Sequence, residues 1–276
     1  MKENTYIFDS ESTTELTRLI TQSRFFVDMC GGPLAGIPEE AETILDLGCG
    51  PGGWVLDVAF ERPKAEVAGI DISVAMVDYA NARAGSQNLY NASFGVMDVT
   101  KPLDFSNDTF DVAHMTLLFA ALKQRQWLPL LQECYRVLRP GGKLHNIEFV
   151  HTVSNSPALQ QEYDLVAQFL YRNGYGFSST GTTVGVSTAL PALLRTAGFT
   201  TIEQKAYLQD FSQGQPTWAS FFRNQEIMSQ MLLPLFVSRG LLLQQEADAL
   251  HRQMMIEFQA DDFACTSYCH GIEAFK

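Results

Sequence analysis

Hydrophobic and polar positions follow a repeating order between residues 43 and 150. Short apolar runs typical of buried strands alternate with segments in which apolar residues recur every three to four positions, as in helices. The predicted strands are 43–48, 65–73, 91–99, 110–117 and 143–150, the predicted helices are 53–60, 74–82 and 127–138, and a turn is predicted at 139–142. Such alternation builds a parallel sheet that helices cover on both faces.

Outside this region the pattern is less regular. Helical spacing is present over 10–30, 156–173 and 190–197, a polar glycine-bearing loop lies at 176–187, and two more strands are predicted at 200–208 and 263–275. We therefore predict an α/β fold with a doubly wound, seven-stranded, mostly parallel sheet.

About fifty residues between the last two predicted strands also have helical spacing. Their aromatic and methionine stripe is predicted to pack in a core, with the wall of an apolar ligand pocket as the alternative. The stripe comprises Trp218, Phe221, Phe222, Met228 and Met231. We interpret this segment as part of a helical cap.

The predicted division of the chain follows from these patterns. It consists of an N-terminal helical cap segment (1–40), a Rossmann-like cofactor-binding core (41–153), a cap insertion (154–188), a second part of the core (189–209), a helical insertion (210–262) and the last core strand (263–276).

Composition narrows the class of protein. The chain has 276 residues, of which 46% are apolar, so it can bury a core as one large domain or as one domain with a sizeable insertion. Its net charge of −12 opposes binding to nucleic acid. The longest apolar run, which starts at Met231, is interrupted by Pro234 and Arg239, so no membrane span is predicted. We expect a cytoplasmic protein, with a homodimer as one possible assembly.

The five cysteines have neither CxxC nor zinc spacing. We interpret them as reduced, mostly buried thiols, and we predict no metal site.

A glycine-rich loop is the first candidate for chemistry. It follows the first predicted strand and opens the first helix, which allows a ligand to approach the backbone closely. Gly48, Gly50 and Gly53 satisfy GxGxxG, and Asp71 ends the next strand roughly 20 residues later, where an acid that binds ribose belongs. The ligand is therefore expected to be adenosine-like, which leaves NAD(P) and S-adenosylmethionine.

Asp46 favours the second cofactor. A carboxylate two residues before the glycines would oppose a pyrophosphate, whereas it suits the ammonium and sulfonium of S-adenosylmethionine. Pro51 also removes one N–H donor that a pyrophosphate would use.

Five sequence blocks extend this interpretation. LDLGCGPGGW, VAGIDIS, the acid in GVMDV, FDVAHM and ECYRVLRPGGKL occur in order over about residues 42–150. Together they resemble class I S-adenosylmethionine-dependent methyltransferases, most closely the small-molecule branch that includes quinone-biosynthesis enzymes. The resemblance implies an antiparallel last strand. The long insertion between the sixth and seventh strands departs from the tight hairpin usual in the family.

The resemblance also implies roles for individual residues. By this similarity the methionine end of the cofactor is lined by Asp46, Gly48 and Gly50, the ribose is bound by Asp71, the adenine is contacted by Ile72, Asp98 and Val99, and the methionyl part lies beside the backbone of His114 and Met115. Arg18, in the segment that folds over the cofactor in related enzymes, is a candidate for its carboxylate.

Catalytic candidates are expected beyond the carboxyl ends of the strands. His114 ends the fourth strand, and Glu148 and His151 end the fifth. Each is a candidate general base, with an ordinary structural role as the alternative, because methyl transfer from a sulfonium can proceed by proximity and alignment alone.

The predicted function is S-adenosylmethionine-dependent methyl transfer to an oxygen or carbon, less readily a nitrogen, of a moderately apolar small molecule. One alternative is an NAD(P)-dependent oxidoreductase, which the literal GxGxxG favours, although no Tyr-x-x-x-Lys pair is present. A protein that binds S-adenosylmethionine without methylating is the other.

Overall fold

A single seven-stranded sheet organises the chain, with strand order β3-β2-β1-β4-β5-β7-β6. The computed structural model describes residues 6–276; the first five residues of the predicted cap segment lie outside the described residues. The strands are β1 (Thr43–Leu47), β2 (Glu66–Asp71), β3 (Ala92–Val96), β4 (Phe110–Thr116), β5 (Leu138–Ser154), β6 (Thr201–Asp210) and β7 (Cys265–Phe275). β7 runs antiparallel to both of its neighbours, and the remaining pairs are parallel. The predicted fold class is confirmed.

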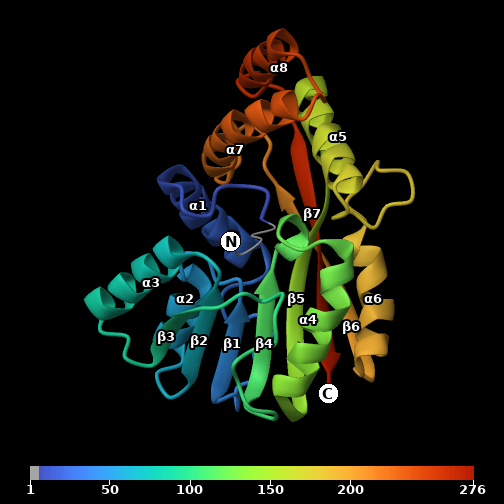
Figure 1. Cartoon of the computed structure of the whole chain (residues 1–276). Helices are drawn as coiled ribbons and strands as arrows, with labels where there is room; N and C mark the ends of the chain where they lie inside the picture. Colours follow the sequence, from blue (N-terminus) through green and yellow to red (C-terminus); the bar gives the residue numbers. More distant parts are fainter. Residues whose placement is uncertain (1–5) are drawn as a thin grey trace.

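Helices cover the sheet and rise above its carboxyl edge (Figure 1). They are α1 (Thr13–Met29), α2 (Gly53–Glu61), α3 (Val74–Gln87), α4 (Gln124–Val137), α5 (Pro157–Arg172), α6 (Val186–Ala197), α7 (Trp218–Ser238) and α8 (Gln244–Glu257), with a 3-10 turn η1 (Leu118–Ala120). α4 and α6 pack together on one face of the sheet. α1 contacts α7, and α8 contacts both α5 and α7, above the carboxyl ends of the strands.

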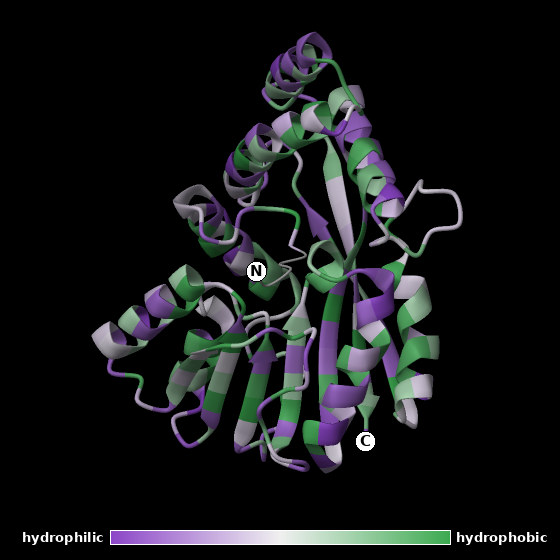
Figure 2. Cartoon of the chain, viewed as in Figure 1, coloured by the Kyte–Doolittle hydropathy of each residue, from purple (hydrophilic) through white to green (hydrophobic). Residues whose placement is uncertain are grey.

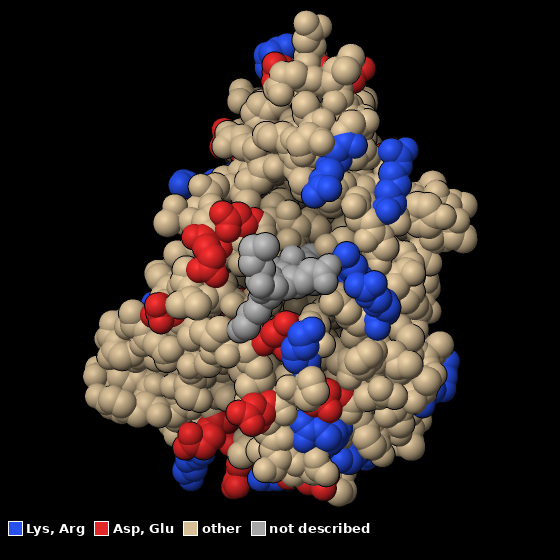
Figure 3. Space-filling model, in the orientation of Figure 1, with Lys and Arg blue, Asp and Glu red and all other residues tan. Residues whose placement is uncertain are grey.

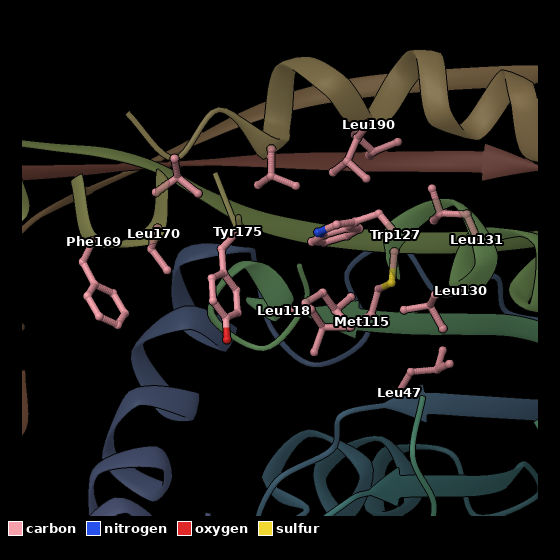
Figure 4. Packing of buried hydrophobic residues seen from close by; sticks show 14 of the residues in the cluster. Leu47, Met115, Leu118, Trp127, Leu130, Leu131, Phe169, Leu170, Tyr175 and Leu190 are labelled. Atoms are coloured by element: carbon pink, nitrogen blue, oxygen red, sulfur yellow. The ribbon is translucent and has the colours of Figure 1, made fainter. Parts of the chain in front are cut away.

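Alternation along the strands produces two separate cores. In β1, Ile44 packs with α2 on one face, whereas Leu45 and Leu47 pack on the other. That second face is the larger core, and Figure 4 shows Trp127 of α4 among its leucines, close to Met115 of β4. Successive side chains of a strand point to opposite sides, and β1 is buried on both sides. Its apolar residues therefore contribute to both cores. Figure 2 shows hydrophobic bands along the central strands, interrupted by hydrophilic ones in β4 and β5.

β5 differs from its prediction at both ends. It begins at Leu138 and includes the predicted turn, where the register against β4 shifts and Gly141 takes a φ of +81°. It continues to Ser154, because β7 pairs with it from Lys143 to Ser154. The extended β5–β7 pair projects beyond the shorter strands and carries the connections to α5 and α8 (Figure 1).

The aromatic stripe of α7 packs as predicted. Trp218 stacks on Phe222 with ring centroids 5.5 Å apart, and its indole N–H donates to the carbonyl oxygen of Phe258. Phe221 stacks on Phe211 at 4.4 Å. Two residues of the stripe, Phe221 and Met228, also line the cavity described below.

The five cysteines are free and buried, which confirms the prediction of buried thiols. Among the described helices, none combines the length and apolar composition that crossing a bilayer requires.

Candidate functional site

A cavity of about 300 Å³ opens above the carboxyl ends of the central strands. Its floor consists of the glycine loop after β1 and the ends of β2 and β4, and its roof consists of α1 and α7. At the sheet it is lined by the carboxylates of Asp46, Asp71 and Asp98, whereas under the helices the lining is mainly aromatic and aliphatic. One continuous space therefore joins an acidic end to an apolar end.

The glycine loop is locked by its own hydrogen bonds. The N–H groups of Gly48 and Cys49 both donate to the carbonyl oxygen of Ile70, at 2.8 and 3.0 Å. Gly50 N–H donates to Oδ2 of Asp71 at 2.9 Å. Of the other loop residues, Gly52 donates its N–H to the carbonyl oxygen of Cys49, and Pro51 has no N–H. The backbone donors from 48 to 52 are thus occupied before any ligand arrives.

Positive φ angles explain why this loop contains glycine. Gly48, Gly50 and Gly52 have φ of +76°, +51° and +75°, a region that residues with a Cβ adopt only at a cost. A Cβ on Gly48 would also lie 2.7 Å from Leu118 Cδ2. The third glycine of the literal motif, Gly53, is the first helical residue of α2 and has no positive φ.

Asp46 and Asp71 place two carboxylates on neighbouring strands. Burial raises the pKa of Asp46 well above its usual range, and the nearby Asp71 raises it further. Burial also raises the pKa of Asp71, although N–H groups of Ser73 and Gly50 donate to it and partly offset the effect. Both acids would therefore be stabilised as carboxylates by a cation in the cavity.

The predicted adenine-contact residues also meet at this end of the cavity. Ile72, Asp98 and Val99 all line it. Asp98 Oδ1 accepts from the N–H and hydroxyl of Thr100 at 2.9 and 2.7 Å, which fixes the turn after β3.

His114 lies beside Asp46 across the β1–β4 pair. Its ring stacks on Trp54 with centroids 3.8 Å apart, its Nδ1 is 3.2 Å from Nδ1 of His145, and its Nε2 is 2.8 Å from the Thr116 hydroxyl. Burial lowers the pKa of His114 well below its usual value, and His145 lowers it further. The imidazole is therefore neutral with both nitrogens engaged, so it is poorly placed to act as a free base.

Arg18 lines the cavity but is already paired. Its Nε and Nη2 donate to the two carboxylate oxygens of Glu15 at 2.7 Å, and both side chains are buried. Burial opposes the charge of the guanidinium, but the hydrogen bonds to Glu15 outweigh it and raise its pKa. The third nitrogen, Nη1, donates to Oδ1 of Asn224 at 3.5 Å. The guanidinium of Arg18 therefore pairs with the carboxylate of Glu15 and not first with the carboxylate of a bound ligand.

Comparison with known proteins assigns the core of the chain. Residues 44–142 match a family described as a methyltransferase domain. The chain carries a class I S-adenosylmethionine-dependent methyltransferase domain. The match covers the strands and the glycine loop that form the acidic end of the cavity.

Curated relatives agree with this assignment. The chain is 32% identical over 135 residues to a demethylmenaquinone methyltransferase of Lactococcus lactis, and the alignment covers 49% of this chain and 50% of that protein. It is 29% identical over 179 residues to an arsenite methyltransferase of Halobacterium salinarum, covering 63% and 41%. The chain spans about half the length of the curated relatives it matches or less.

Solved structures share the fold. Phosphoethanolamine N-methyltransferase 2 of Haemonchus contortus, solved with S-adenosylmethionine, superposes with a TM-score of 0.53 at 20% identity over 94% of this chain and 52% of that one. An S-adenosylmethionine-dependent methyltransferase of Methanosarcina mazei gives 0.53 at 21% identity over 87% and 95%. These structures establish the architecture of the methyltransferase domain and its surroundings.

Three predicted site residues have side chains that do not point into the cavity, although Met115 was predicted to take part only through its backbone. The side chain of Met115 is buried in the α4 core, since it alternates with His114 along β4. Glu148 is fully buried behind the loop after β4, and its carboxylate accepts from the N–H groups of Leu118 and Phe119 at 3.0 and 3.2 Å. His151 is half-buried opposite Tyr268, past the point where β5 slips against β7. The structure therefore does not bring Glu148 and His151 to the cavity as bases.

Glu148 instead positions the loop that forms one wall of the cavity. Burial raises its pKa to about 8, although Asn146 and the two N–H groups donate to it. Because the folded-state value exceeds the unfolded value of about 4.3, this group's stability contribution is complete below about pH 4 and is lost as pH rises towards 8.

The thermal unfolding midpoint of the wild type should fall between pH 5 and pH 8 as Glu148 ionises. We expect this fall to be smaller in Glu148→Gln, since glutamine does not ionise there. Part of the pH dependence of the midpoint will remain in this variant, because burial also raises the pKa of Glu162, to about 7. Glu133→Gln is the matched control, because hydrogen bonds from Arg136 lower the pKa of Glu133 and place its effect at acidic pH. Thermal scans across this range test the assignment, and an unaltered slope in Glu148→Gln would contradict it.

Two cavity features were missed by sequence reasoning. His145 lies in the middle of a predicted strand, a position typical of a structural residue, yet it lines the cavity beside His114. Asn224 and Gln225 of α7 are buried and line the cavity between Phe221 and Met228. A pair of amides inside an otherwise apolar helical stripe was the available signal for this second feature.

Proposed function

We propose that the protein transfers a methyl group from S-adenosylmethionine to an oxygen or carbon, less readily a nitrogen, of a moderately apolar small molecule. The observation that carries the proposal is the continuous cavity, whose acidic end suits a cationic cofactor and whose apolar end suits such an acceptor. The relatives named above include a quinone-pathway and an arsenite methyltransferase, and the aromatic lining favours the organic acceptor over the inorganic one.

The glycine loop supports this cofactor over a dinucleotide. A dinucleotide fold binds pyrophosphate through free N–H groups at the start of the helix. Here the N–H groups of the loop before the helix are already bonded to Ile70, Asp71 and Cys49, and Asp46 adds a negative charge nearby. The same arrangement is compatible with a ligand that carries a sulfonium and an ammonium in place of phosphate.

The chain supplies a fitting set of cofactor contacts. We propose that Asp46, Gly48 and Gly50 hold the methionine end, with the backbone of His114 and Met115 alongside. Asp71 would bind the ribose hydroxyls, and the adenine would lie between Ile72 and Val99 with its amino group donating to Asp98. S-adenosylmethionine, when bound, supplies the electrophilic methyl group.

The protein's own contribution to methyl transfer is placement and exclusion of water. The apolar roof formed by α1 and α7 keeps water from the reacting atoms, and the cavity walls hold the acceptor in line with the methyl group. No free base is evident among the cavity histidines, because burial holds the pKa of His114 well below its usual value and that of His145 at about 4. We therefore propose that the acceptor enters in a form that is already nucleophilic, any proton having been lost to solvent before it binds.

We also propose a division of labour along the chain. Residues 41–153 and 189–209, with the last strand at 263–276, form the cofactor-binding core. Residues 1–40, 154–188 and 210–262 form the cap that selects the acceptor. Figure 3 supports a small-molecule acceptor over nucleic acid, because Lys and Arg on this face stand as separate side chains and form no continuous basic surface.

Calorimetric titration with S-adenosylmethionine and with NADPH tests the cofactor. We expect micromolar binding of the first and none of the second; binding of NADPH alone would overturn the proposal. Incubation with methyl-labelled S-adenosylmethionine and an organic-solvent extract of cells tests the reaction. A labelled product supports methyl transfer, whereas cofactor binding without any labelled product would indicate a protein that binds the cofactor without methylating.

A further inference from the structure

The apolar end of the cavity contains one buried polar group with an unused donor. Gln225 of α7 is 1% exposed and lines the cavity, and within residues 6–276 its Nε2 has no hydrogen-bond partner. Its helical neighbours on the same face, Phe221 and Met228, are apolar and line the cavity as well. A buried amide without a partner destabilises the folded protein, so its presence in this wall calls for a ligand.

The orientation of this amide follows from the groups behind it. Arg18 has only donors, so the atom that Asn224 presents to it must be its oxygen, Oδ1. The nitrogen of Asn224 then faces Gln225 and donates to Oε1 at 3.5 Å. The Gln225 nitrogen is consequently left as the free end of the chain, and it can only donate.

The buried Glu15–Arg18 pair anchors this arrangement. Arg18 is held by two 2.7 Å hydrogen bonds from its guanidinium to Glu15, and the hydroxyl of Tyr6 also donates to Glu15. The guanidinium cannot turn without breaking a buried ion pair, which is strongly unfavourable. The ion pair therefore fixes the direction of both amides.

We propose that Gln225 Nε2 donates a hydrogen bond to a carbonyl or phenolic oxygen of the methyl acceptor, and that Asn224 and Arg18 are positioning residues for this donor. The proposal rests on the proposed function and narrows its substrate class to flat, largely apolar molecules that carry an oxygen acceptor. The surrounding lining matches a ring system, since Phe25, Phe211 and Phe221 line the same end of the cavity.

The test uses two probes of matched shape, 2-acetylnaphthalene and 2-ethylnaphthalene, which differ by one carbonyl oxygen. Their dissociation constants are measured by equilibrium dialysis against protein saturated with S-adenosylhomocysteine. The variant is Gln225→Met, which keeps the length and helix propensity of the side chain but removes the donor. The control is Met228→Leu, on the same helical face and without a polar group.

We expect Gln225→Met to weaken binding of the acetyl probe by about tenfold relative to binding of the ethyl probe. Met228→Leu should leave the ratio of the two dissociation constants unchanged. The unfolding midpoint of ligand-free Gln225→Met should stay within about 2 °C of wild type, because the change removes one unpaired donor and leaves Asn224 with another. A purely structural role for Gln225 would lower the midpoint and weaken both probes alike.

An unchanged ratio in Gln225→Met, or failure of the wild type to bind either probe, would overturn the proposal. Titration with S-adenosylhomocysteine alone is carried out on each variant. If the wild type does not bind S-adenosylhomocysteine, the proposed function is contradicted. If cofactor binding is intact and only the discrimination between the two probes is lost, the result bears on the role of Gln225 alone.

Discussion

Asp46→Asn should abolish tight S-adenosylmethionine binding while making the ligand-free protein more stable. Asp46 is 5% exposed beside a second acid, and both effects raise its pKa. Removing the carboxylate removes the partner of a buried cation, which weakens affinity by about 100-fold or more. Removing it also relieves an unpaired buried charge, so the unfolding midpoint of the free protein should rise by about 2–6 °C at pH 7.

The pH dependence of the free protein gives the sign of the second effect. Because the folded-state pKa of Asp46 is raised, its contribution to stability is complete below the unfolded value of about 3.9 and is lost as pH rises through the folded value. The gain in Asp46→Asn should therefore grow with pH. Calorimetric titration and thermal scans at pH 5 and pH 8 measure both quantities.

Asp111→Asn is the control with the opposite expected sign. Its carboxylate, at the other end of the sheet, accepts from the N–H groups of Glu42 and Thr43 and from Arg139, and despite some burial these hydrogen bonds lower the pKa of Asp111. This substitution should reduce stability and leave cofactor affinity unchanged. If the free Asp46→Asn protein unfolds at a lower temperature than wild type, or binds the cofactor normally, the electrostatic account of the site is wrong.

The acidic end of the cavity could be predicted from the sequence because its parts lie at strand ends. Asp46, Asp71 and Asp98 each follow or end an apolar run, and parallel strands bring their carboxyl ends to one edge of the sheet. Once the alternation of strands and helices was recognised, this convergence required no knowledge of distant contacts.

The apolar end was harder to predict because it depends on contacts between distant segments. Asn224 meets Arg18 across 206 positions of sequence, and helical spacing alone does not say which face of α7 covers the cavity. Glu148 illustrates the same difficulty on a strand. Its position at the end of β5 suggested a catalytic base, but its side chain turns towards the loop after β4 and supports the wall of the cavity from behind.

Glycine spacing was informative only in part. The GxGxxG pattern located the loop, yet its third glycine, Gly53, has an ordinary helical φ, whereas Gly52 outside the pattern has a φ of +75°. Gly52 also lies against the ring of Phe94 and Cβ of Ala80. The GxGxxG pattern therefore includes Gly53 but leaves out Gly52, the glycine whose lack of a Cβ matters most.

Gly52→Ala should destabilise the protein by about 2–5 kcal/mol, through the cost of a positive φ and overpacking together. The new Cβ would lie 2.7 Å from two atoms of the Phe94 ring and 2.8 Å from Ala80 Cβ, and neither neighbour has a flexible end that can move aside. Since Gly52 is the N-cap of α2, the shift would also displace the glycine loop and weaken S-adenosylmethionine binding. Urea unfolding and calorimetric titration measure the two losses.

Gly85→Ala is the matched control for the same substitution without strain. Gly85 lies within α3, has no positive φ, and a Cβ there would meet nothing within 4 Å. Alanine should raise stability by about 0.5–1 kcal/mol, because glycine is the poorer helix former, and cofactor affinity should not change. Opposite signs for the two variants would show that backbone conformation and close packing at Gly52, not glycine content in general, hold the loop in its binding shape. Equal effects would mean that the loop relaxes around a Cβ, and the requirement for glycine at position 52 would then have to come from the ligand.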